Sequence, residues 1–309
     1  MGGLSDMDIK SIIVQSYEIG PIGETENPRH GSGNTTLLEA GGKKYVAKCN
    51  ERPDFIRTYA QAQVYLEQEG LRHPRLVKTR ATAWMTPEGV ALYEFVEGET
   101  VDIFSSSQLT TALKYLRRYN QTLKQVPLAQ DDLEFRNHWD QARSLPFLVS
   151  ELPSFLATAD IPDKFKAVIN VALASFAPLQ QALSANKQLI HADPGPGNFL
   201  LSGDEIVAII DFTPDYNHQF YSLAQFVYWT HLWPGAGINR DALDYYLIQY
   251  LGEKVTDSDR LLFFYFLIYA ALFRVTGPLL DCLQRDGDVT RLSKRVEVLA
   301  QLVGMVNKI

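Results

Sequence analysis

Four polar side chains in the stretch HADPGPGNFLLSGDEIVAIIDF, residues 191–212, have the types and the spacing to do chemistry. His191, Asp193 and Asn198 share one turn, and Asp211 follows an apolar run. Two acids and an amide on neighbouring loops cost folding free energy unless a cation joins them. Carboxylate, amide and phosphate oxygens are the ligands that Mg²⁺ prefers. The stretch therefore predicts a site for Mg²⁺ and nucleotide phosphates.

Such a set of groups matches the needs of phosphoryl transfer. That reaction requires an acid that orients and deprotonates the attacking hydroxyl, oxygen ligands for the metal, and a cation on the phosphates. Residues 199–211 read as a hairpin that turns at Ser-Gly-Asp, residues 202–204. The hairpin would return Asp211 to the neighbourhood of Asn198.

The elements that position these residues divide the chain in two. The first hundred residues are mostly strand-like, with strands expected at 17–22, 34–40, 43–49, 75–82 and 89–98 and a helix between 52 and 74. Gly-Gly joins two of these strands as in a hairpin, and Gly70 lies where a helix C-cap would. Helices are expected at 105–127 and 163–185, and nearly everything after residue 212 is helical. The fold class is thus α+β with two lobes, a small antiparallel β lobe at 1–97 and a larger, mostly helical lobe at 98–309.

Composition excludes several classes of partner. The 309 residues are 46% hydrophobic and 21% charged, as in ordinary globular proteins, and the net charge of −7 disfavours nucleic acid. The most apolar run, 261–273, is shorter than the roughly 20 residues that span a bilayer, so we expect a core helix and no membrane partner. Cys49 and Cys282 suggest no disulfide scaffold, and no secretory leader is visible. A cytoplasmic protein is expected.

The motif resembles one known family. His191-x-Asp193-x₄-Asn198, with Asp211 thirteen residues after the Asn, is similar to the HGDxxPGN motif and metal loop of the aminoglycoside phosphotransferase family, with Ala192 in place of Gly. That family includes choline/ethanolamine kinases and type II homoserine kinases and has a protein-kinase-like fold. Residues 17–49 resemble its nucleotide-binding opening, 93–99 its hinge, and 220–229 the helix after its metal loop.

The resemblance implies ATP and Mg²⁺ as cofactors and a role for each matching residue. Asp193 would be the catalytic base, Asn198 and Asp211 the Mg²⁺ ligands, and His191 a structural brace of the catalytic loop. The nucleotide would be held by Lys48 on the α- and β-phosphates, by backbone around Gly31, Ser32, Gly33 and Asn34, and by main chain at Glu94, Phe95 and Val96 for the adenine.

Three positions depart from the family pattern. The helix Glu that usually pairs with the Lys falls on Tyr59, and Glu67 or Glu69 could replace it only in another register. Ser222 stands where the family has the acid of YDLA, which should weaken the support of the catalytic loop. Phe212 follows Asp211 where a Gly is usual.

Several alternatives stay open at this point. Alone, a Gly-Ser-Gly turn, a strand-end Lys or an Asp-Pro-Gly turn is ordinary structure, so the joint order of the residues carries the hypothesis. The missing helix acid favours a second hypothesis, a nucleotide-binding scaffold without turnover. A metal-dependent phosphoesterase would need more His or Asp ligands.

The acceptor is the least determined part of the prediction. Because HRD and APE elements are absent from the sequence, we expect a small-molecule hydroxyl rather than a protein. An amino alcohol such as homoserine or choline, an aminoglycoside, and a sugar all fit. Asp215 and Tyr216, just after the metal loop, are candidates to face it. The oligomeric state is not readable from the sequence.

Overall fold

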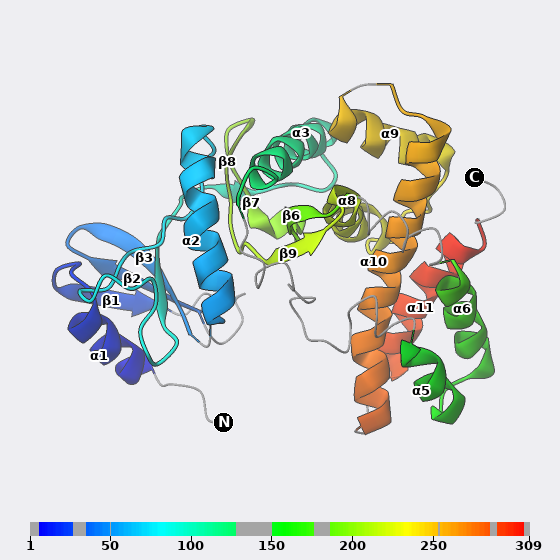
Figure 1. The fold of residues 1–309 in the computed structure, drawn as a ribbon, viewed down its shortest axis with the longest axis horizontal. Coiled ribbons are helices and arrows are strands. Elements are labelled where there is room, and N and C mark those ends of the chain that lie inside the picture. Colours follow the sequence, from blue (N-terminus) through cyan, green and yellow to red (C-terminus); the bar gives the residue numbers. More distant parts are fainter. Residues whose placement is uncertain are drawn as a thin grey trace.

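A four-stranded antiparallel sheet forms the centre of the N-terminal part of the computed structural model (Figure 1). The strands follow chain order: β1 (Ile22–Glu26), β2 (Thr35–Ala40), β3 (Lys43–Lys48) and β4 (Ala91–Glu94). The structure describes residues 6–26, 35–49, 51–127, 150–175, 186–252, 254–284 and 289–305.

The turn between β2 and β3 confirms the predicted glycine hairpin. Gly41 and Gly42 both have positive φ, 57° and 75°, as a tight two-residue hairpin turn requires. A Cβ atom at Gly41 would also lie 2.8 Å from the carbonyl oxygen of Ile19, so glycine is needed there. The resulting register pairs Lys48 with Thr35 on one side and with Ala91 on the other. Lys48 is therefore anchored between two strands at the end of β3.

Three expectations about the first hundred residues are wrong. Helix α1 (Asp6–Ser16) precedes the sheet, where no helix was expected. Residues 17–22 form no full strand, because Gly20 with φ of 84° interrupts the run and β1 begins only at Ile22. The run 75–82 contributes isolated bridges alone, since a tight turn in which the Thr82 N–H donates to the Thr79 carbonyl breaks it.

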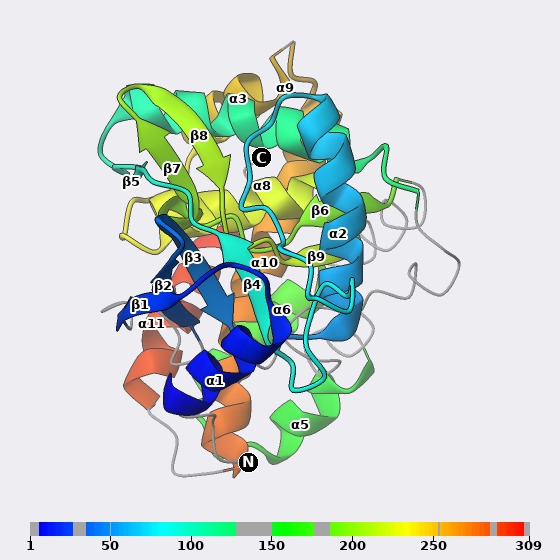
Figure 2. The ribbon, with the colours of Figure 1, turned by 90° about the vertical axis from the view of Figure 1, so that its left-hand side faces the viewer.

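Helix α2 (Pro53–Gln68) stands between the sheet and the helical part of the molecule (Figure 1). Its predicted C-cap is confirmed, because Gly70 has φ of 66° and the next N–H, of Leu71, donates to the Leu66 carbonyl at 2.8 Å. Figure 2 faces the sheet, with α2 upright beside it and the hairpin of β7 (Phe199–Ser202) and β8 (Glu205–Ile209) above.

The C-terminal part is mostly helical, as predicted. The predicted helix 105–127 is α3, N-capped by Ser105, whose side chain accepts from the Gln108 N–H at 3.4 Å. The predicted helix 163–185 begins as α6, and residues 176–185 lie outside the described part of the chain. The helices are α3 (Ser106–Leu123), α5 (Leu152–Thr158), α6 (Asp163–Ala174), α8 (Gln219–Val227), α9 (Arg240–Leu251), α10 (Asp257–Gln284) and α11 (Val289–Val303).

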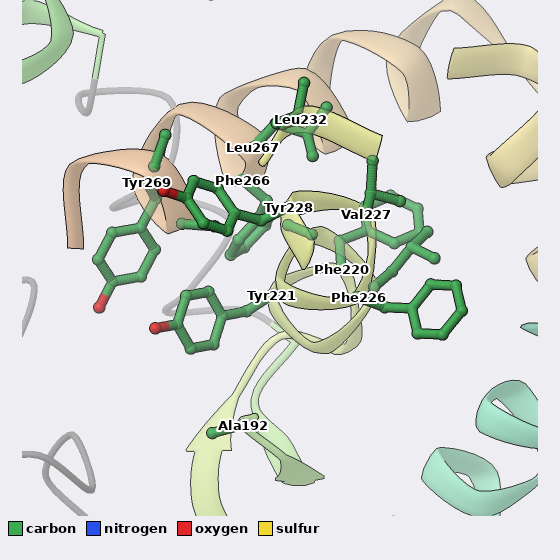
Figure 3. Packing of buried hydrophobic residues seen from close by; sticks show 14 of the residues in the cluster. Ala192, Phe220, Tyr221, Phe226, Val227, Tyr228, Leu232, Phe266, Leu267 and Tyr269 are labelled. Atoms are coloured by element: carbon green, nitrogen blue, oxygen red, sulfur yellow. The ribbon is translucent and has the colours of Figure 1, made fainter. Parts of the chain in front are cut away.

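Helix α10 is the core helix of this lobe, but it is much longer than the apolar run 261–273 indicated. It spans 28 residues and continues through Arg274, the residue that follows the apolar run. By length and composition α10 could cross a membrane, yet 83% of its most apolar window is buried inside the protein. Figure 3 shows the reason: aromatic side chains of α8 pack on α10, with Tyr221 and Tyr269 stacked at 4.8 Å between ring centroids.

Two strand pairs build the scaffold of the site. Strand β6 (Gln188–His191) pairs antiparallel with β9 (Pro214–Asn217), so that His191 lies opposite Pro214. Strands β7 and β8 form the predicted hairpin, with Gly203 at positive φ in the turn. Strand β5 (Glu99–Thr100) pairs with β7, so the chain after residue 98 already joins the helical part.

The N-terminus of α8 generates a pH-dependent prediction. His218 caps this helix by accepting from the Phe220 N–H at 3.1 Å, and burial lowers its pKa from 6.5 to about 4. Below pH 6.5 the unfolded chain binds a proton that the folded chain does not, so the contribution of His218 to stability is lost as pH falls toward 4. The Asn side chain of a His218→Asn variant can also cap the helix, but it does not bind a proton in this pH range.

Urea unfolding of wild type and variant between pH 7 and 4.5 tests this. As pH falls, the free energy of unfolding of the wild type should decrease relative to that of the variant by up to ~1.4 kcal/mol per pH unit. Parallel pH profiles for the two proteins would contradict this assignment.

Candidate active site

Two loops meet at the ends of the strand pairs. The Ile210 N–H donates to the Asn198 carbonyl at 2.8 Å, and the Ala192 N–H donates to the Thr213 carbonyl at 2.8 Å. Loop 192–198 and loop 210–213 are thus bonded side by side, which brings Asp193, Asn198 and Asp211 into one neighbourhood. The geometric prediction from the hairpin is confirmed, because the antiparallel register leaves Asp211 directly after the residue that bonds to Asn198.

His191 ties the two loops together. Its ring is fully buried, and Nδ1 accepts from the N–H groups of both Asp193 and Thr213, each at 3.3 Å. Burial lowers the pKa of His191 to about 4, although the charges of Asp193 and Asp211 act in the opposite direction. The imidazole is therefore neutral at pH 7 with its proton on Nε2. These are the contacts that a brace of the catalytic loop needs.

The carboxylate of Asp193 is held from one side. Its Oδ1 accepts from the Arg274 guanidinium at 2.5 Å and from the Trp229 indole N–H at 3.2 Å. The Asn198 side chain donates to the Asp193 backbone carbonyl at 2.8 Å. Within the described residues, nothing donates to Oδ2, and the side chain is 24% exposed. One carboxylate oxygen is pinned and the other is left for a partner.

Arg274 and Trp229 are site residues that the sequence analysis missed. Trp229 is the last residue of the run 220–229; it is only half-buried, and its ring lies against the backbone of Gly195 in the catalytic loop. Arg274 directly follows the apolar run 261–273, and its side chain is 5% exposed within α10. The available signal was the Arg itself, because a cation within an apolar helix must find a buried partner.

Ser222 occupies the position of the family acid, and it does not replace that acid. Its Oγ is buried, and no hydrogen-bond partner for it lies within the described part of the chain. The catalytic loop is supported by residues of α10 and α8 instead. Arg274 of α10 holds Asp193 through Nη2. The same guanidinium donates to Gln225 Oε1 of α8 through Nε at 3.1 Å and Nη2 at 2.7 Å.

Lys48 and Asp211 form an ion pair between the sheet and the metal loop. The surroundings of Asp211 tend to raise its pKa by desolvation, but the Lys48 charge and hydrogen bond outweigh this and the net shift is downward. Asp211 is a non-glycine residue with φ of 57°, an uncommon conformation that directs its carboxylate toward the sheet. The sequence analysis left Lys48 without a protein partner because it searched only helix α2 for an acid. The partner comes from the metal loop.

Glu51 is a third acid near this ion pair, and the sequence analysis did not single it out. It lies three residues after Lys48 and is half-buried. Desolvation raises its pKa, the Lys48 charge lowers it and the Asp211 charge raises it, so the three groups share one electrostatic environment. Its position only three residues after Lys48 was the sequence feature that could have identified it.

Tyr59, in the slot of the family Glu, packs in an aromatic core. Its ring lies 5.4 Å from that of Phe212 and 5.9 Å from that of Tyr93, and its hydroxyl donates to the Pro74 carbonyl at 2.5 Å. Phe212 continues the contact to His191 at 5.6 Å. Glu67, the proposed substitute, pairs with Arg75 at 2.9 Å instead of Lys48. Tilted ring contacts therefore connect α2 to the metal loop.

The structure describes only some of the other residues that are predicted to bind the nucleotide. Gly31, Ser32, Gly33 and Asn34 lie outside the described residues. At the hinge, the Glu94 N–H donates to the Arg75 carbonyl at 2.8 Å and the Phe95 N–H donates to the Lys44 carbonyl at 3.0 Å. Within the described part of the chain, the Val96 N–H has no such acceptor. Of the three hinge N–H groups, that of Val96 is the one available to hydrogen-bond a nucleobase.

The two candidate acceptor residues differ in their setting. Asp215 is 3% exposed, and its carboxylate accepts from Asn217 at 3.3 Å inside β9. Burial raises its pKa to about 6. Asp215 is thus enclosed where Tyr216 is not, and its contact with an acceptor stays a prediction. Tyr216, the next residue along the strand, is partly exposed on the opposite face and stays a candidate.

With this geometry in place, the chain was compared with known proteins. A model of the phosphotransferase enzyme family, APH, matches residues 24–257. The chain belongs to this family. The resemblance drawn from the motif is thereby confirmed. A comparison with curated protein sequences found no match.

Several solved structures share the fold of this chain, although their sequence identity to it is low. The amicoumacin kinase hAmiN, in complex with AMP-PNP, Ca²⁺ and Ami, is 19% identical with a TM-score of 0.65, over 99% of this chain and 94% of that one. A microcompartment-associated aminopropanol kinase is 15% identical with a TM-score of 0.70, over 97% and 95%. The choline kinase LicA from Streptococcus pneumoniae is 16% identical with a TM-score of 0.59, over 90% and 93%. The kinase-like two-lobe fold is therefore established.

Tyr59 yields a test of the aromatic connection. Tyr59→Phe removes the hydrogen bond to Pro74 and should lower the free energy of unfolding by about 0.5–1.5 kcal/mol. Tyr59→Ala also removes a ring that is 4% exposed, and should cost about 3–5 kcal/mol, as for other buried aromatics. Denaturant unfolding of the two variants measures both effects. Equal losses for Phe and Ala would show that the ring contacts contribute nothing.

Proposed function

We propose that this chain transfers the γ-phosphoryl group of ATP to a hydroxyl of a small molecule. The observation that carries the proposal is the Asp193 carboxylate, which is fixed at Oδ1 and open at Oδ2 beside the loop that bears Asp211. Membership of the phosphotransferase family supports the same reaction class. The acceptor hydroxyl would bind Oδ2 and pass its proton to Asp193 as its oxygen attacks the γ-phosphorus and ADP leaves.

The residues present fit a divalent metal. Asn198 uses its amide nitrogen on the Asp193 carbonyl, and among the described residues nothing donates to its Oδ1. The Asp211 side chain is 60% exposed, and among the described residues its ion-pair partner is the ammonium of Lys48. An amide oxygen and a carboxylate are hard ligands suited to Mg²⁺ with nucleotide phosphates. When bound, the metal would neutralise charge that develops on the phosphates.

The nucleotide would bridge the two lobes. The Glu94 carbonyl and the Val96 N–H would take the adenine edge, and Lys48 would move from Asp211 to the α- and β-phosphates. Backbone of residues 31–34 would cover the phosphates. His191 would hold loops 192–198 and 210–213 in register without exchanging protons at neutral pH, since its pKa is about 4. Cytoplasm, where ATP is available, is the proposed compartment.

Asp193→Asn tests catalysis. The amide cannot accept the proton, so kcat should fall by about 10²–10⁴. Binding of ATP with Mg²⁺, followed as a rise in melting temperature, should persist because Asp193 does not hold the metal. Turnover at the wild-type rate in the variant would reject Asp193 as the base.

Asp211→Ala tests the metal site. ATP at 100 times its dissociation constant should stabilise the wild type by about 2.7 kcal/mol in the presence of Mg²⁺. The variant should lose the Mg²⁺-dependent part of this shift. Asp204→Ala, an exposed acid in the turn of the same hairpin, is the matched control and should keep it. If both variants respond like the wild type, Asp211 is not a ligand.

A nucleotide-binding scaffold without turnover remains the second candidate, and Tyr59 in place of the helix Glu favours it. The two experiments separate the alternatives. A scaffold binds ATP with Mg²⁺ but transfers no phosphoryl group, and Asp193→Asn leaves its nucleotide binding unchanged.

A further inference from the structure

A groove lies between α3 and the C-terminal end of α9, two neighbouring helices (Figure 1 and Figure 2). Two hydrogen bonds join the helices, one between the hydroxyls of Thr110 and Tyr245 at 3.0 Å and one from Asn120 to the Tyr250 hydroxyl at 3.0 Å. The groove has a volume of about 590 Å³. Small-molecule sites have volumes of about 300–1,000 Å³. None of the residues that line the groove belongs to the candidate active site.

Positive charge lines this groove from α3. Lys114, Arg117 and Arg118 are followed by Gln121, and these spacings of three and four residues place all four on one face of the helix. Like charges at such spacings repel each other. Within the described ranges, no acid forms an ion pair with any of the three cations. A chain with a net charge of −7 therefore keeps three positive charges together on one helix face.

These cations also have hydrogen-bond donors to spare. Arg118 donates through Nη2 to the Glu69 carbonyl, which uses one of the five N–H donors of its guanidinium. Neither Arg117 nor Lys114 donates to any residue in the part of the chain that the structure describes. Lys114 and Arg118 are exposed, and Arg117 is half-buried. Both charge and donors are thus available to a ligand from solution.

The hydroxyls beside the groove supply no counter-charge. Burial raises the pKa of Tyr115 to about 12, and the charge of Arg118 acts to lower it. Burial likewise raises the pKa of Tyr250, and the charge of Arg117 acts in the opposite direction. Both phenols are therefore neutral at pH 7. The C-terminal end of α9 contributes only about half of a negative charge, which does not neutralise three cations.

The end of α9 is shaped to admit Arg117. Gly252 ends the helix with φ of 67°, and its N–H donates to the Ile248 carbonyl at 2.9 Å. A Cβ atom at Gly252 would collide with Nη1 of Arg117, so glycine leaves the space that the guanidinium occupies. The side chain of Ile248, which is 46% exposed, also lines the groove. The groove thus combines a cationic side with an apolar side.

We propose that this groove binds a phosphate monoester of a small organic molecule, at a site separate from the candidate active site. A phosphate monoester carries about −1.5 to −2 charges at pH 7 and three strong acceptor oxygens. Guanidinium groups bind such oxygens in pairs, and the ammonium of Lys114 adds a point charge. The carbon skeleton of the ester would pack on Ile248. An acidic peptide has one charge per side chain and matches adjacent guanidinium groups less closely.

Isothermal titration calorimetry on the full-length protein tests this binding. The probes are phenyl phosphate, inorganic phosphate and benzyl alcohol. Phenyl phosphate should bind at one site at least fivefold more tightly than inorganic phosphate, more weakly as salt is added, and benzyl alcohol should not bind. Tighter binding of inorganic phosphate than of phenyl phosphate overturns the choice of an organic ester.

The candidate active site is a second place where a phosphate group is expected, so it needs its own control. Lys48→Ala removes the cation there and should leave the affinity for phenyl phosphate unchanged. Loss of binding in this variant would place the ligand at the active site and overturn the proposal. Asp193→Asn should also bind phenyl phosphate like the wild type, whether or not the protein transfers phosphoryl groups.

Variants then assign the binding to the groove. Lys114→Gln and Arg117→Gln should each weaken phenyl phosphate binding at least fivefold. Lys124→Gln removes an exposed cation of the same chain segment that does not line the groove, and it should bind like the wild type. Arg118 is kept because it also holds the end of α2. Ile248→Ser should reduce the preference for phenyl phosphate over inorganic phosphate. Equal losses in Lys124→Gln and Arg117→Gln would indicate an effect of net charge alone and overturn the proposal.

A peptide of six glutamates tests the other source of negative charge. Binding of this peptide without binding of phenyl phosphate overturns the proposal in favour of an acidic peptide partner. The fold of each variant is checked first by its melting transition. If Arg117→Gln does not fold, Lys114→Gln decides, because Lys114 is exposed and makes no hydrogen bond or ion pair among the described residues. Unchanged affinity in Lys114→Gln then counts against the groove.

Discussion

Each of the two key carboxylates is compensated by a cation from a distant part of the chain, and the site depends on this pairing. Asp193 is paired with Arg274 on α10, and Asp211 is paired with Lys48 on β3. Acidic side chains on bonded, adjacent loops raise the energy of the folded state unless positive charge is supplied. The two pairs differ in character. Arg274 is buried and held by further partners, whereas the Lys48 side chain is partly exposed and pairs with Asp211.

Uncharged side chains also hold loops 192–198 and 210–213 in place. His191 accepts hydrogen bonds from an N–H group of each loop. Because burial lowers its pKa, it is uncharged and adds no positive charge between the carboxylates. Phe212 extends the connection through Tyr59 to the helix beside the sheet. The lobes are thus connected both by ring packing and by the Lys48–Asp211 ion pair.

Two substitutions in the family pattern have structural counterparts elsewhere. Tyr59 replaces a charged helix position by aromatic packing, and the half-buried Glu51 supplies negative charge near Lys48. Ser222 gives no support to the catalytic loop, and Arg274 with Gln225 supports it from the neighbouring helices.

The sequence by itself determined the candidate site and most of the framework. The His191–Asp193–Asn198 spacing and the hairpin before Asp211 are local, and so are the Gly41–Gly42 turn and the Gly70 cap, because each depends on backbone conformations that neighbouring residues dictate. The tertiary structure alone decided the partners of the charges. Arg274 reaches Asp193 across 81 positions and Lys48 reaches Asp211 across 163, and no local pattern encodes such contacts. The strand predictions at 17–22 and 75–82 failed for a local reason, because Gly20 at positive φ interrupts the first run and a turn at Thr79–Thr82 interrupts the second. A buried charge requires a partner, but only the fold determines which residue provides it.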